Sequence, residues 1–149
     1  MMVGGTPFVE RVVRRFLSRV TPDKVTYTGV FLDAPSHTKL VRWWNSAVGI
    51  PLHSTPEADH MTIKFEPTEK EVTTLPLGEK TSLKVVGWAS DDKGQAVLVV
   101  PHGVVSANAY PHVTMSCAPG TQPVYSNELL SRGFTRVNGP TLTGTIEAR

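Results

Sequence analysis

The chain of 149 residues carries 15 basic and 13 acidic residues, a net charge of +2, and 40% of its residues are hydrophobic. These values predict one compact domain and exclude collagen-like, coiled-coil and wholly disordered chains. No apolar run reaches the ~20 residues of a membrane-spanning helix, and the single cysteine, Cys117, excludes an internal disulfide and a multi-cysteine metal site.

The basic excess lies at the N-terminus, because residues 1–24 have a net charge of +3 and the rest of the chain has −1. Pro7 opens a stretch, 8–20, whose apolar residues occupy one half of a helical wheel and whose arginines lie mostly on the other. We therefore predict a basic amphipathic helix in residues 1–24. It docks on the core, contacts a phosphate backbone or partner, or serves as a mitochondrial targeting helix. The single cysteine and the lack of a secretory pattern favour an intracellular protein, in the cytoplasm or alternatively in mitochondria.

Residues 25–149 are predicted to form the main domain, which contains more strands than helices. Strands are expected at 25–33, 60–66, 80–89, 95–100 and 112–117, with a weak last strand at 142–146. Helices are expected at 36–48, where Gly49 provides the C-cap, and at 124–130. Loops or turns are expected at 50–59, 67–78, 91–94 and 102–110. This mixture predicts an α+β fold.

Two segments, 60–65 and 112–117, share the order His, apolar, Thr, apolar, polar, apolar. Because side chains alternate along a strand, each segment presents a histidine and a threonine on one face, about 6.5–7 Å apart. These residues are His60, Thr62, His112 and Thr114. The apolar positions are expected to pack inward, and they are Met61, Ile63, Phe65, Val113, Met115 and Cys117. A third match, at His53-Ser-Thr55, lacks the alternation, and we interpret it as accidental.

Two imidazoles and two hydroxyls around one small volume suit an in-line displacement at phosphorus. One neutral histidine removes a proton from water, and the other, protonated, donates one to the departing ribose oxygen. Both states are accessible near neutral pH, since an unperturbed histidine has a pKa of about 6.5. This chemistry makes His60 and His112 the expected catalytic pair and Thr62 and Thr114 the expected phosphate ligands. It requires no metal or other cofactor.

The motifs His60-Met-Thr62 and His112-Val-Thr114 resemble the paired His-x-Thr motifs of the two-histidine (2H) phosphoesterase superfamily. The wider similarity covers residues 27–130 and resembles the cyclic phosphodiesterase modules of RNA-repair enzymes such as fungal tRNA ligases. It implies a bilobal fold in which two antiparallel sheets flank a central cleft and helices pack outside. It also implies metal-independent opening of a 2′,3′-cyclic phosphate, with the same four residues in the roles given above.

Further residues are candidates for lining the substrate site, namely Tyr27, Tyr110, Tyr125 and Asn127. Tyr27 is expected either to stack on a base or to be an ordinary strand-edge tyrosine. A zinc site is disfavoured because Cys117 and Asp59 are offset by odd numbers from the motif histidines.

The expected partners are RNA ends or small nucleotides, bound by a monomer that does not associate with membranes. Two alternatives are a hydrolase of cyclic mono- or dinucleotide second messengers and a catalytically idle RNA- or nucleotide-binding module. A third is a structural domain in which both histidines only pack.

Overall fold

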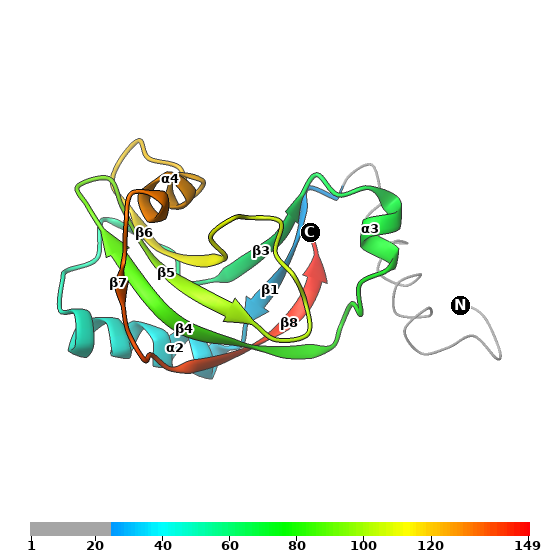
Figure 1. The fold of residues 1–149 in the computed structure, drawn as a ribbon, viewed down its shortest axis with the longest axis horizontal. Helices are drawn as coiled ribbons and strands as arrows, with labels where there is room; N and C mark the ends of the chain where they lie inside the picture. The colour runs from blue at the N-terminus through cyan, green and yellow to red at the C-terminus, as the bar shows by residue number, and fades with distance from the viewer. Residues whose placement is uncertain (1–24) are drawn as a thin grey trace.

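The computed structural model describes residues 25–149, so the predicted N-terminal helix lies outside the described part of the chain. The strands are β1 (Tyr27–Leu32), β2 (Thr55–Pro56), β3 (His60–Phe65), β4 (Lys80–Ser90), β5 (Gly94–Pro101), β6 (His112–Cys117), β7 (Thr135–Arg136) and β8 (Thr141–Ala148). The helical elements are α2 (Ala34–Trp43), the π-helical turn η2 (Trp44–Val48), α3 (Glu69–Thr73) and α4 (Tyr125–Ser131). The predicted α+β class is confirmed (Figure 1).

Six strands close into one antiparallel barrel, in the order β1, β3, β6, β5, β4 and β8, with β8 pairing back to β1. The short strands β2 and β7 pair with β6 and β4. The predicted pair of separate sheets is not confirmed, because β6 pairs with both β3 and β5 and so joins what would be two sheets. Register shifts in the β4–β5 and β5–β6 pairs accompany this closure, since such irregularities bend and twist a strand.

Alternate residues of the barrel strands form the core. Met61 and Ile63 of β3 and Val113 and Met115 of β6 are buried in one cluster, as predicted. Phe65 is 61% exposed, so the prediction that it packs inward is wrong. The β1–β3 register shifts where Thr28 pairs with Lys64 but Gly29 pairs with Thr62, and the additional residue, Ile63, reverses the alternation before Phe65.

The helix α2 follows the capping signals of its sequence. The carboxylate of Asp33 accepts a hydrogen bond from the backbone N–H of Ser36 at 2.8 Å, and Pro35 occupies the first turn, where no N–H partner is needed. The helix therefore begins slightly earlier than predicted, and Gly49 ends η2 in the expected left-handed conformation, with a φ of 74°. Figure 1 shows α2 and α4 on opposite sides of the sheet.

Two elements depart from the prediction. The segment 67–78 was expected to be a loop but contains α3, because Thr68 and Glu71 form a reciprocal capping box at its start. The last strand, expected to be weak, has eight residues and pairs with both β1 and β4. None of the helices within residues 25–149 has the length and apolar character needed to cross a membrane.

Candidate active site

A pocket of about 510 Å³ lies beside β3 and β6 and is lined by all four motif residues, His60, Thr62, His112 and Thr114. Its volume falls within the range of about 300–1,000 Å³ that is usual for small-molecule sites. The two segments that the sequence singled out, 52 residues apart, therefore meet at one site.

The register of the two strands decides how the four side chains are arranged. Met61 pairs with Val113 in the antiparallel β3–β6 ladder. This is the one residue pair of the ladder, so the two His-x-Thr motifs meet at their middle residues, and each motif has its histidine on one side of that pair and its threonine on the other. The register changes beyond it, because the N–H of Ala58, which precedes β3, donates to the carbonyl oxygen of Thr114. All four motif side chains nevertheless line the same pocket.

His112 is the more buried of the two histidines, with 8% of its surface exposed. Its Nδ1 lies 2.8 Å from the carbonyl oxygen of Tyr110. Because a carbonyl can only accept, Nδ1 carries the hydrogen and Nε2 is the nitrogen that can take up a proton. Burial lowers the pKa of His112, an effect that the Tyr110 carbonyl opposes and the neighbouring His60 reinforces.

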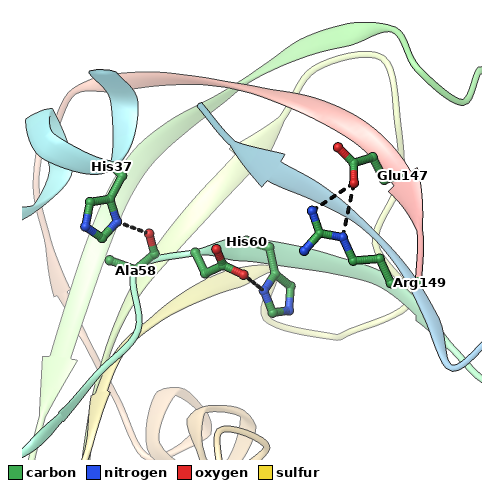
Figure 2. A network of polar contacts seen from close by, with 6 residues as sticks. His37, Ala58, His60, Glu147 and Arg149 are labelled. Atoms are coloured by element: carbon green, nitrogen blue, oxygen red, sulfur yellow. Dashed lines mark hydrogen bonds and ion pairs between the residues drawn. The ribbon is translucent and has the colours of Figure 1, made fainter. Parts of the chain in front are cut away.

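His60 stands in a different environment, among aromatic rings and a carboxylate. Its Nδ1 lies 3.2 Å from Asp59 Oδ2, a contact drawn in Figure 2. The ring of Phe31 stacks on the imidazole with 5.0 Å between centroids, and the ring of Tyr27 lies at 5.1 Å. Arg149 lies over the Phe31 ring at 3.6 Å and is held by Glu147. These contacts fix the plane of the His60 ring and leave its Nε2 available for a substrate.

A scan against models of known protein families finds no match to this chain, and a search of curated proteins finds none either.

The hydroxyl of Thr114 lies in a buried network beneath α4. Its Oγ1 is 2.8 Å from Ser126 Oγ, and it donates a longer hydrogen bond of 3.3 Å to the carbonyl oxygen of Pro123. Thr114 has one proton, so a bound anion competes with the Pro123 carbonyl for it, while Ser126 can donate to the oxygen of Thr114. Nothing in the sequence pattern distinguishes Ser126 from other helix serines, so the sequence analysis missed it.

The loop between β5 and β6 forms one wall of the pocket. Ser106 Oγ donates to the carbonyl oxygen of Thr62 at 2.7 Å, and the N–H of Ala107 donates to that of Ile63 at 2.7 Å. These bonds hold the loop along the edge of β3 and bring Asn108 to the pocket.

Of the other predicted residues, Tyr27 and Asn127 line the pocket, whereas Tyr110 and Tyr125 do not. Tyr110 packs against the small apolar cluster under α4 and contributes only its carbonyl, through His112. The hydroxyl of Tyr125 donates to the Asp91 carboxylate instead. Several further residues line the pocket without having been predicted from the sequence, and they are Thr26, Glu57, Asp59, Phe65, Asn108, Pro123 and Val124.

Two further observations concern histidines and metals. His53, from the third His-x-Thr match, is outside the pocket, and its Nε2 lies 2.7 Å from the carbonyl oxygen of Asp91. Within residues 25–149, no three His, Cys, Asp or Glu side chains are placed so that they could hold a metal ion together.

Proposed function

We propose that this protein is a metal-independent phosphodiesterase that hydrolyses 2′,3′-cyclic phosphates, at RNA ends or in cyclic nucleotides. The observation that carries the proposal is the convergence of His60, Thr62, His112 and Thr114 on one pocket, around the Met61–Val113 pair. In the proposed complex, a phosphate bound by the two hydroxyls has an imidazole on either side, as an in-line displacement requires. The resemblance to the 2H superfamily points the same way. Its two lobes would correspond to two halves of the closed sheet, one ending in β3 and the other in β6.

His112 is the general base in this proposal. Its Nε2 has a free lone pair, and the lowered pKa keeps the ring neutral near pH 7. As the oxygen of a water molecule bonds to phosphorus, Nε2 of His112 takes the proton of that water.

His60 is the general acid. Its Nδ1 faces an anionic acceptor, the carboxylate of Asp59, whereas Nδ1 of His112 faces a neutral carbonyl. Since His112 serves as the base, His60 is the imidazole left to donate a proton, and the Asp59 carboxylate orients it by accepting from its Nδ1. When the bond between phosphorus and the ribose oxygen breaks, Nε2 of His60 donates its proton to that oxygen. The product is a phosphomonoester with a free neighbouring hydroxyl, and the two histidines return to their starting states by proton exchange with water.

Thr62 and Thr114 donate hydrogen bonds to the non-bridging oxygens of the phosphate, where negative charge increases in the transition state. A hydrogen bond to a charged group contributes about 1.5–3 kcal/mol, so each hydroxyl has a measurable effect on the rate.

The direct test is hydrolysis of a nucleoside 2′,3′-cyclic monophosphate by the purified protein. His60→Ala and His112→Ala are each expected to lower turnover by about 10²–10⁴-fold. His102→Ala is the matched control, because this histidine is exposed and lies outside the pocket. Wild-type turnover by both motif variants would contradict the proposal. Tight binding of the nucleotide without any product would indicate a binding module instead.

A further inference from the structure

The chain makes a sharp turn between β2 and β3, and a buried residue in this turn has an unusual backbone conformation. Ala58 has a φ of 56°, in the left-handed region that side chains other than glycine seldom adopt, and only 1% of its surface is exposed. Its neighbours Glu57 and Asp59 both line the pocket, and His60 follows directly after them. A backbone conformation of this kind persists only where surrounding contacts hold it. The contacts of this turn therefore matter for the candidate active site.

Backbone hydrogen bonds hold the turn from two sides. The N–H groups of Glu57 and Ala58 donate to carbonyl oxygens of β6, and the acceptor for Ala58 is Thr114, at 2.8 Å. On the other side, the N–H of Leu32, the last residue of β1, donates to the carbonyl oxygen of Asp59 at 2.9 Å. None of these bonds uses the carbonyl oxygen of Ala58, which lies at the centre of the turn.

That carbonyl oxygen accepts a hydrogen bond from His37, a residue outside both His-x-Thr motifs. Nδ1 of His37 lies 2.8 Å from it, and Figure 2 shows this contact. Because a carbonyl can only accept, Nδ1 carries a hydrogen whether the ring is neutral or charged. His37 lies in the first turn of α2, where its own N–H donates to the carbonyl oxygen of the N-cap residue Asp33 at 2.9 Å. The start of a capped helix thus holds the imidazole against the turn.

The bond from His37 leads to the proposed general acid through one peptide group. The carbonyl of Ala58 and the N–H of Asp59 belong to the same planar unit, so His37 fixes the orientation of the chain from which the Asp59 side chain extends. The carboxylate of Asp59 lies 3.2 Å from Nδ1 of His60. Without His37, this peptide group is free to rotate towards a commoner conformation of Ala58, and the carboxylate then moves away from Nδ1.

We infer that His37 is a positioning residue of the candidate active site. It holds the peptide between Ala58 and Asp59 and through it keeps the Asp59 carboxylate on His60. His37 is not among the residues that line the pocket, so it acts through Asp59 and not on the substrate. This inference rests on the proposed phosphodiesterase function and adds a residue of α2 to its machinery.

The first test is the kinetics of His37→Ala in the full chain with a nucleoside 2′,3′-cyclic monophosphate. We expect kcat to fall about three- to tenfold, the effect of one hydrogen bond, and KM to stay within about twofold, because the pocket that binds the substrate is unchanged. His37→Asn should restore most of the lost turnover, since its Nδ2 is as many bonds from the backbone as Nδ1. Thr38→Ala, at the next exposed position of α2, is the matched control. An equal loss in the alanine and asparagine variants, or a change confined to KM, would overturn the inference.

The second test asks whether His37 acts through Asp59. If the two residues belong to one chain of contacts, the double variant His37→Ala/Asp59→Asn should have the same kcat as Asp59→Asn alone. Losses that multiply in the double variant would show that His37 and Asp59 act independently, and they would overturn the inference.

The third test does not depend on activity. If the wild type hydrolyses no cyclic nucleotide, the proposed function is contradicted, and hydrogen exchange of the Ala58 amide then shows whether His37 holds the turn. His37→Ala should speed this exchange about three- to tenfold, whereas His37→Asn should keep it slow and the amide of Val113 should be unaffected in both. An Ala58 amide that exchanges at the wild-type rate in His37→Ala would overturn the inference.

Discussion

Met61 of β3 and Val113 of the neighbouring strand β6 form a residue pair of the barrel, and both are fully buried. Their burial fixes the register of two strands that come from distant parts of the sequence. A shift by one residue would move the apolar side chains out of the core and the histidines into it, at a large cost in burial. The geometry of the candidate active site is therefore enforced by the same contacts that hold the barrel closed.

Ser126 is expected to support Thr114 in binding the phosphate. Ser126→Ala removes the buried partner of the Thr114 hydroxyl, and with it a contact that holds this hydroxyl in place at the pocket. We expect kcat/KM for a 2′,3′-cyclic nucleotide to fall about 5–10-fold, consistent with the loss of about 1 kcal/mol of hydrogen bonding. Ser131→Ala, on the exposed side of the same helix, is the control and should retain wild-type activity. If both serine variants behave alike in steady-state kinetics, Ser126 has no role in the site.

Asp59 is expected to act through His60 and not on the substrate directly. Asp59→Asn keeps an oxygen beside Nδ1 but removes its charge, so the protonated imidazole loses its anionic partner. We expect kcat/KM for a 2′,3′-cyclic nucleotide to fall about tenfold, because one hydrogen bond to a charged group contributes about 1.5–3 kcal/mol. Other charged groups near this ring are Glu57, which also lines the pocket, and Arg149 over Phe31. Glu57→Gln is therefore the control, and an equal loss of kcat/KM in both variants would refute a specific role for Asp59.

The local elements could be read from the sequence because short-range signals specify them. Asp33 and Gly49 cap α2, and the alternation at Met61 and Val113 separates the core face of two strands from the face that carries the motifs. The same alternation failed at Phe65, because the β1–β3 register shifts at Ile63 and reverses the faces, so that Phe65 lines the pocket together with its partner Tyr27.

Contacts between distant parts of the chain could not be predicted from the sequence pattern. The pairing of β5 with β6, which turns two expected sheets into one barrel, depends on twist and bulges that the composition does not encode. The partner of Thr114 is Ser126 on α4, a contact that only the packing of that helix creates. The sequence thus predicted which four residues carry the proposed chemistry, while the fold decides which groups orient them.

The burial of His112 should make the stability of the fold depend on pH. Because the pKa of His112 is lowered in the folded state, the unfolded chain binds the proton more readily. Stability is therefore highest above the unfolded value of about 6.5 and falls as the pH drops below it, towards the lowered folded value. Urea unfolding of the wild type and of His112→Gln at about pH 5 and pH 7.5 measures this contribution. The variant should lose less stability between these pH values than the wild type, whereas His102→Gln should match the wild type. An identical pH dependence in all three proteins would contradict this role of His112.

Gly144 is expected to be required for closure of the barrel. A Cβ at this position of β8 would lie 2.6 Å from the backbone carbonyl oxygen of Phe31 in β1, so an alanine forces two paired strands apart. Gly144→Ala should lower the free energy of unfolding by about 1–3 kcal/mol, the usual cost of overpacking a core. Thr145→Ala, one residue further along the strand and half-buried, should cost less, because it removes atoms without creating a clash. Since Phe31 also stacks on His60, the strand displacement should lower turnover as well. A Gly144→Ala variant with wild-type stability and wild-type turnover would show that β1 and β8 are not in close contact at this point.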